Sequence, residues 1–117
     1  MNFLSLDYGT KNIGLAYSLN GIIFTLPTLP NDDKFIPSLQ AIITLHSIEK
    51  IYVGLSYGRM AKLTKKFINQ LSAVIKLPIE TVDEAASTVE ADEIHKKNHH
   101  GLVDSVAAAV ILRRVIS

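Results

Sequence analysis

The sequence has 117 residues, of which 48% are hydrophobic, so it can form one domain around a single apolar core. It contains no cysteine, which excludes disulfide scaffolds, thiolate zinc sites and cysteine nucleophiles. The formal net charge is +1, so overall charge alone indicates neither a strongly acidic nor a strongly basic partner.

The N-terminal segment carries no basic leader, and Asp7 comes too early for the apolar part of a signal peptide. No apolar run in the sequence is long enough to span a bilayer. We therefore expect a cytoplasmic protein with no membrane association and one domain over residues 1–117.

The first quarter of the chain is expected to form three antiparallel strands. These strands are residues 3–6, 13–18 and 22–26. The dipeptide Asn20-Gly21 separates the second strand from the third, and both residues tolerate the positive φ that a tight hairpin needs. Pro27 and Pro30 are expected to end this part of the sheet.

Helices and parallel strands are expected after the hairpin. In chain order they are a helix that starts at residues 31–33, a strand over 51–55, a helix over 60–74, a strand over 78–82, and helices over 87–96 and 101–116. Helical spacing selects the residues that the first two helices bury: Phe35, Leu39, Ile42, Ile43 and Leu45 in the first, and Leu63, Phe67, Leu71 and Val74 or their near neighbours in the second. Strands alternating with helices predict an α/β fold with a mixed five-stranded sheet.

Carboxylates lie where an α/β sheet places its functional site, outside the C-terminal ends of its strands. Asp7 closes the first strand, and Asp83 and Glu84 close the last one. Asp104 lies in the first turn of an otherwise apolar helix. Converging carboxylates repel one another unless a cation lies between them. Oxygen ligands without sulfur favour Mg²⁺ or Mn²⁺, and paired ions of this kind can activate water for phosphodiester hydrolysis.

Each of these carboxylates also has a structural interpretation. Asp7 could be a turn residue. Glu84 could form a capping box with Thr81, and Asp104 could stabilise the positive end of its helix. The interpretation as a metal site therefore depends on the coincidence of all three acids.

Basic and acidic residues are separated along the chain. Residues 57–77 contain five cations and no acid: Arg59, Lys62, Lys65, Lys66 and Lys76. Residues 78–95 contain six acids and no Lys or Arg: Glu80, Asp83, Glu84, Glu90, Asp92 and Glu93. This separation indicates either two solvated helix faces of opposite sign or one surface for a polyanion and another for metal.

Four segments resemble, in the right order, the signatures of the YqgF (RuvX-like) family. Residues 7–16 (DYGTKNIGLA) resemble its opening D-[FY]-G-x-K-x-[IV]-G-x-A motif, and residues 53–55 resemble its V-G-L-P strand end. Residues 83–91 resemble its D-E-R-x-[ST]-[ST]-x-E-A block, and residues 103–112 resemble its closing V-D-x-x-A-A-x-x-I-L helix. The first and last segments are the most specific, and the likeness covers nearly the whole chain.

The resemblance implies a ribonuclease H-like fold and a hydrolase that cleaves nucleic acid with Mg²⁺ or Mn²⁺. It implies that Asp7, Glu84 and Asp104 are the catalytic metal ligands. Lys11 falls on the family's lysine and would contact a substrate phosphate, although an exposed turn lysine is an equally good explanation. Family members are described as nucleases that mature the end of pre-16S ribosomal RNA, a step of ribosome biogenesis, and as Holliday junction resolvases. A resolvase favours a homodimer, whereas a processing nuclease can act as a monomer.

Departures from the family pattern affect the expected substrate contacts. Ser56 replaces a proline, and Ala85-Ala86 replace an Arg-Leu pair, which removes a cation. Arg59 and Lys62 could compensate for that arginine. His99 and His100 precede the last helix, where His100 could contact substrate and either could protonate a leaving group, although exposed loop histidines are more common.

Two rival functions remain open on the sequence. Asp7-x-Gly9-Thr10 is similar to the phosphate loop of actin-like ATPases, and the Gly9-Thr10 backbone lies where a phosphate could approach. Those ATPases need two such domains, however, and this chain supplies one. The other rival is a non-catalytic nucleic-acid-binding module of the same fold, in which the basic segment carries the function.

Overall fold

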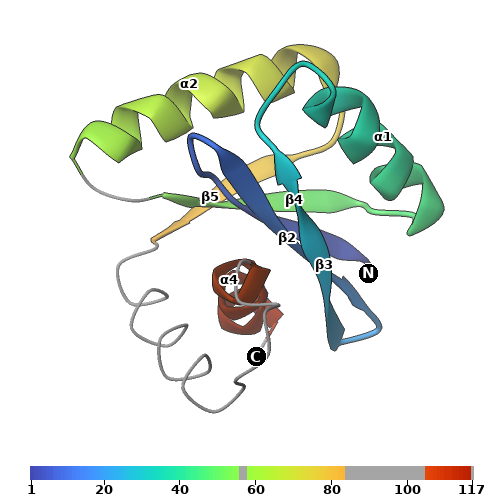
Figure 1. Cartoon of the computed structure of the whole chain (residues 1–117). Coiled ribbons are helices and arrows are strands. Elements are labelled where there is room, and N and C mark those ends of the chain that lie inside the picture. Colours follow the sequence, from blue (N-terminus) through green and yellow to red (C-terminus); the bar gives the residue numbers. More distant parts are fainter. Residues whose placement is uncertain (56–57, 84–104, 117) are drawn as a thin grey trace.

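The computed structural model describes residues 1–55, 58–83 and 105–116. These residues form an α/β fold with a mixed five-stranded sheet and three helices, as the sequence predicts (Figure 1). The elements in chain order are β1 (Phe3–Asp7), β2 (Asn12–Leu19), β3 (Ile22–Pro30), α1 (Phe35–Leu45), β4 (Lys50–Leu55), α2 (Arg59–Val74), β5 (Ile79–Asp83) and α4 (Val106–Ile116).

The sheet has the strand order β3-β2-β1-β4-β5. β1, β2 and β3 are antiparallel neighbours, whereas β4 pairs in parallel with both β1 and β5. Asn20 and Gly21 have φ angles of 51° and 85°, which confirms the predicted tight hairpin between β2 and β3. The parallel half of the sheet brings the C-terminal ends of β1, β4 and β5 to one edge.

β3 extends through both prolines, so the prediction that Pro27 ends this part of the sheet was wrong. β3 is an edge strand, and an edge strand can accommodate a residue that has no N–H to donate. The register passes from Leu15↔Leu26 to Ile13↔Leu29. Two residues of β3, Pro27 and its neighbour, therefore face one residue of β2, which is the geometry of a β-bulge.

Helices cover both faces of the sheet and form two apolar clusters (Figure 1). On one face, α1 and α2 bury the larger cluster against the strands: Leu4, Leu6, Ile13, Leu15, Phe35, Leu39, Ile48, Ile51, Val53, Phe67, Leu71 and Ile75. On the other face, α4 packs on the smaller cluster: Ala16, Tyr52, Ala108, Ile111 and Leu112. The two faces are therefore distinguished by the helices that cover them.

Two predicted core residues are exposed. The Leu45 side chain at the end of α1 is 76% exposed, and Val74 at the end of α2 is 47% exposed. Both lie in the last turn of their helix, and the neighbouring Ile75 takes the buried place at the end of α2. The predicted apolar stripe of α1 therefore extended too far at Leu45, whereas at the end of α2 a near neighbour of Val74 is buried, as the prediction allowed.

The helices otherwise follow the expected pattern with shifted starts. α1 begins at Phe35 and not at residues 31–33, because Asp32 forms a turn in which its Oδ1 accepts the backbone N–H of Lys34 at 3.0 Å. The helix predicted over 87–96 and the first turn predicted over 101–104 lie outside the described residues. Among the residues that are described, no helix is long and apolar enough to cross a bilayer.

Candidate active site

The C-terminal edge of the parallel strands gathers several of the predicted site residues. In the register, Leu6 of β1, Val53 of β4 and Thr81 of β5 lie side by side. Asp7 is the last residue of β1, and Asp83 is the last residue of β5, separated from β1 only by β4. Neighbouring strands lie about 4.8 Å apart, so the backbones of β1 and β5 are about 10 Å apart at this edge.

Asp7 lies on the face of the sheet that α4 covers. Side chains alternate along a strand, so Phe3, Ser5 and Asp7 share one face of β1. Phe3 packs against the α4 cluster, and the buried Ser5 hydroxyl donates to the Ala108 carbonyl of α4 at 2.5 Å. The partly buried Asp7 carboxylate therefore belongs to the α4 side, opposite α1 and α2.

The positions beside Asp7 are glycines. Gly14 of β2 is its partner in the register, and continuing the β1–β4 register by one residue aligns Gly54 with it. Both glycines are buried, so neither adjacent strand places a side chain next to the carboxylate. No other described residue forms an ion pair or hydrogen bond with the Asp7 side chain. Among the described residues, this carboxylate therefore has no counter-charge.

Ser105 fixes the start of α4 beside this position. Its hydroxyl accepts the backbone N–H of Leu15 at 3.1 Å and donates to the carbonyl of Leu26. Leu15 and Leu26 are register partners at the β-bulge, so the hydroxyl lies between two strands where a ladder hydrogen bond would otherwise form. The anchored residue of β2 is next to Gly14, the partner of Asp7. The start of α4 is therefore held close to the end of the sheet where Asp7 lies.

Replacing Ser105 by Ala is expected to lower the free energy of unfolding by about 1–3 kcal/mol, because the buried N–H of Leu15 and the partly buried carbonyl of Leu26 lose their partner. Urea denaturation followed by circular dichroism measures this change. Ser72→Ala is the matched control, because Ser72 is exposed on α2, and it should change stability by no more than about 0.5 kcal/mol. Equal stability of the two variants would contradict the anchoring role.

The loop between β1 and β2 is held in a tight conformation. A Cβ atom on Gly9 would lie 2.3 Å from the backbone oxygen of Asn12, so no other residue fits without moving the loop. Asn31 fixes the same loop from the end of β3, because its side-chain amide donates to the Gly9 carbonyl and its backbone N–H donates to the Lys11 carbonyl, both at 2.9 Å. Thr10 and Lys11 are exposed on this loop, which follows Asp7.

The loop also has an apolar attachment on the other face. The ring of Tyr8 packs on Phe67 of α2 with centroids 4.7 Å apart, and Phe67 in turn contacts Phe35 of α1 at 5.7 Å. Asp7 and Tyr8 therefore lead to opposite faces of the sheet. The partly buried ring of Tyr8 therefore packs on the core.

The predicted cations on α2 lie on the other side of the sheet from Asp7. Arg59 is the first residue of α2 and follows the end of β4 after a short connection, so it is close to the same edge. Lys62 is one turn further on and exposed on the outer side of α2, opposite the buried Phe67 and Leu71. The structure therefore brings Thr10, Lys11 and Asp7 together, places Arg59 nearby, and separates Lys62 from them.

Three predicted site residues, Glu84, Asp104 and His100, lie outside the described residues. Within the described residues, no cluster of three or more His, Asp or Glu residues could hold a metal ion. Glu80, another acid of the same segment, pairs with Lys50 at 2.8 Å, and this contact raises the pKa of Lys50. Lys50 is the first residue of β4, so this ion pair lies at the N-terminal end of the parallel strands, whereas Asp7 lies at their C-terminal end.

Sequence reasoning missed the residues that support the site. Ser105 and Asn31 act through contacts 90 and 22 residues away along the chain, which no local pattern reveals. Gly14 and Gly54 gave a usable signal, because glycine inside a strand often marks a bulge or a close approach.

Solved structures with a similar fold cover nearly the whole chain. RuvC of T. thermophilus, solved in complex with a Holliday junction substrate, superposes with a TM-score of 0.60 at 16% identity, covering 98% of this chain and 96% of that one. The fowlpox virus Holliday junction resolvase gives a TM-score of 0.56 at 16% identity, with the same coverage of the two chains. The protein thus has the ribonuclease H-like fold of the RuvC-like resolvases.

Sequence relatives define the family. A protein of Crocosphaera subtropica named "Putative pre-16S rRNA nuclease" is 35% identical over 128 residues, covering 95% of this chain and 89% of its own length. A protein of the same name from Picosynechococcus is 36% identical over 127 residues, covering 95% of this chain and 88% of its own. The family model described as RuvX, Holliday junction resolvase, matches residues 1–117. The chain belongs to the RuvX family, which confirms the resemblance that the motifs indicated.

Proposed function

We propose that this protein is a nuclease that hydrolyses phosphodiester bonds with a divalent metal held by Asp7, Glu84 and Asp104. The observation that carries the proposal is the environment of Asp7. Its carboxylate is partly buried at the C-terminal edge of the sheet, lies between two glycine positions, and has no counter-charge among the described residues. A bound cation would supply that missing charge.

The described neighbours of Glu84 and Asp104 support their assignment as ligands. Val82 belongs to the α4 cluster, so the alternation along β5 places Asp83 on the α2 side, away from the face of Asp7; Glu84 is the next acid in the sequence. This favours Glu84 over Asp83 as the ligand. Asp104 directly precedes Ser105, which is anchored to β2 one residue from the partner of Asp7.

The donor set fits a hard cation. Three carboxylates provide oxygen atoms only, which suits Mg²⁺ or Mn²⁺. Such an ion, when bound, activates a water and stabilises the leaving oxygen of the phosphodiester. Lys11 would bind a phosphate next to the scissile one, and the backbone of Thr10 would orient it, because the Gly9 loop holds both beside Asp7. Arg59 would contact the nucleic-acid strand at the point where that strand passes the start of α2.

Structured RNA is the substrate that we propose first. Relatives that this chain matches along 95% of its length carry the name of a pre-16S rRNA nuclease, whereas the resolvases share only 16% identity and therefore support the fold alone. A four-way DNA junction is the second substrate.

The test uses the purified full-length chain with a pre-16S rRNA fragment and with a four-way DNA junction, each in Mn²⁺ and in EDTA. We expect cleavage of the RNA in Mn²⁺ and none in EDTA, read on denaturing gels. Preferential cutting of the junction would assign the enzyme to DNA. Cleavage of neither substrate would contradict the proposal.

The outer face of α2 supports a second candidate function, a non-catalytic nucleic-acid-binding module. Four exposed cations lie on this helix, which contains no acid: Arg59, Lys62, Lys65 and Lys66. None of them forms an ion pair with another described residue. Such a surface would bind phosphates with an affinity that falls steeply with salt. If EDTA leaves the affinity for RNA unchanged and the RNA is not cleaved, the result would favour this function over the nuclease.

A further inference from the structure

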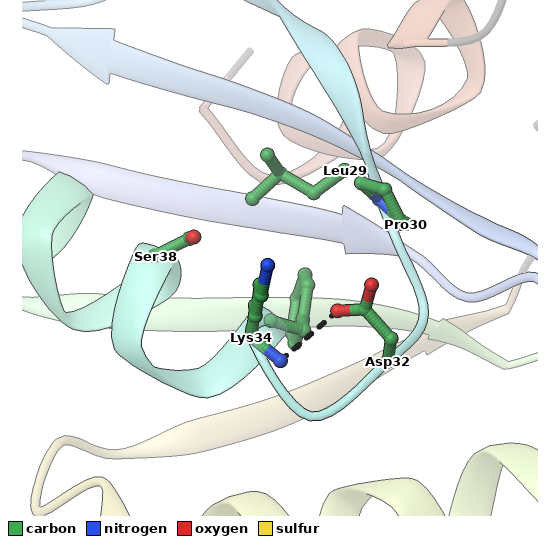
Figure 2. Close-up of a pocket in the computed structure, with 6 residues that line it drawn as sticks. Leu29, Pro30, Asp32, Lys34 and Ser38 are labelled. Atoms are coloured by element: carbon green, nitrogen blue, oxygen red, sulfur yellow. Dashed lines mark hydrogen bonds between the residues drawn. The ribbon is translucent and has the colours of Figure 1, made fainter.

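A pocket of about 170 Å³ lies where β3 passes into α1. Leu29, Pro30 and Phe35 form its apolar part, and Asp32, Lys34 and Ser38 form its polar part. Figure 2 shows Asp32 and Ser38 on opposite sides, with the side chain of Lys34 extended between them and Leu29 and Pro30 on the adjacent strand. None of these residues belongs to the proposed metal site.

The pocket opens at the same edge of the sheet as Asp7, but toward the other face. β3 runs in the same direction as β1, and its last residue, Pro30, pairs with Asn12 at the start of β2. Leu29 and Phe35 belong to the cluster under α1 and α2, whereas Asp7 lies on the α4 face. The loop over residues 9–11 lies between the pocket and Asp7.

Asn31 connects the pocket physically to that loop. It follows Pro30 and precedes Asp32, and its two hydrogen bonds hold the backbone of Gly9 and Lys11. A nucleic-acid strand that extends from Asp7 across this end of the sheet would therefore pass Lys11 and reach Lys34 next. Both lysines are exposed, and neither forms an ion pair with another described residue.

The size and chemistry of the pocket fit a single ring with a hydrogen-bond donor. Its volume is well below the roughly 300 Å³ at which pockets for drug-sized ligands begin, so it suits one ring and not a whole nucleotide. Asp32 uses Oδ1 to accept the N–H of Lys34 and retains Oδ2 as an acceptor. A carboxylate accepts from the amino group of cytosine and repels the O4 carbonyl of a uracil-type ring.

We propose that this pocket binds an unpaired cytosine of the nucleic acid next to the cleavage site. The base lies against Leu29, Pro30 and Phe35, its amino group donates to Asp32, and Lys34 binds the adjoining phosphate. Unpaired bases are the parts of structured RNA that proteins read by their edges. The inference rests on the proposed function, because it assigns a substrate contact to that nuclease.

The test is an NMR titration of the ¹⁵N-labelled full-length chain with CMP and with UMP in EDTA. The two probes differ at the pairing edge of the ring: cytosine has an amino group at position 4 and an acceptor at N3, whereas uracil has O4 and an N3–H. We expect CMP to shift the amide signals of Leu29, Lys34, Phe35 and Ser38, and to bind roughly fivefold or more tightly than UMP. The experiment needs neither metal nor cleavage, so its failure is distinguishable from failure of the nuclease proposal.

Two variants separate pocket binding from attraction to surface charge. Ser38→Leu fills the pocket without changing charge and should abolish the CMP shifts, whereas Gln40→Leu on the exposed side of α1 should preserve them. Asp32→Asn should remove the preference for CMP over UMP. Equal binding of the two probes, or CMP shifts that persist in Ser38→Leu, would overturn the proposal.

Discussion

Asp7→Asn is expected to abolish metal-dependent cleavage while the fold remains intact. The amide has nearly the shape of the carboxylate but no negative charge to hold a cation. Removing an outer partner of a metal ligand already costs about 10–100-fold in metal affinity or activity, so loss of a ligand itself should exceed this range. Cleavage rates in Mn²⁺ and Mn²⁺ binding followed by electron paramagnetic resonance measure the two effects.

The stability of the same variant gives an independent readout. Asp7 has no described partner that Asn would lose, so the free energy of unfolding should stay unchanged or rise. Asp33→Asn is the matched control, since it removes an exposed carboxylate outside the proposed metal site and should leave cleavage at the level of the unmodified chain. Unchanged cleavage by Asp7→Asn would show that this carboxylate does not hold the catalytic metal.

Features that depend on neighbouring residues were predictable from the sequence. The Asn20-Gly21 hairpin was, because both turn residues adopt the positive φ that the turn type requires. The parallel half of the sheet was predictable from the alternation of strands and helices, and it places Asp7 and Asp83 at one edge. The local rules therefore located the edge of the sheet where the candidate site lies.

Features that depend on distant parts of the chain were not predictable. Whether Pro27 can lie in a strand depends on that strand being at the sheet edge and on the bulge opposite Gly14. The Ser105 hydroxyl is inserted between Leu15 and Leu26, residues that no pattern near Ser105 indicates. These two features meet at the same bulge, which lies beside the register partner of Asp7, so the anchoring of the start of α4 by Ser105 could not be predicted from local patterns.

The position of the basic segment relative to the candidate site also depends on distant parts of the chain. Its residues lack acidic neighbours in the sequence, which correctly indicated a cationic surface on α2. The sequence did not indicate which face of the sheet α2 covers. Because Asp7 lies on the α4 face, Lys62 can contact only a substrate that extends around the edge of the sheet, whereas Lys11 lies beside Asp7.

Gly9→Ala is expected to impair both stability and cleavage, because the added Cβ would lie 2.3 Å from the backbone oxygen of Asn12. A backbone atom cannot turn aside as a flexible side chain can, so the loop must move. Overpacking of this kind costs about 1–3 kcal/mol of unfolding free energy. Movement of the loop also weakens its hydrogen bond to Asn31 and displaces Lys11, so cleavage per folded molecule should fall.

Gly21→Ala separates the catalytic effect from the loss of stability. Gly21 has a φ of 85°, which disfavours alanine by about 1–2 kcal/mol, yet no atom lies within 4 Å of the added Cβ. It lies in the hairpin at the other end of β2 and should retain full cleavage per folded molecule at a comparable cost in stability. Denaturant unfolding and cleavage rates below the unfolding transition provide the comparison. Equal cleavage by the two variants would show that the Gly9 loop supports the fold but does not position the substrate, because only Gly9→Ala displaces Lys11 relative to Asp7.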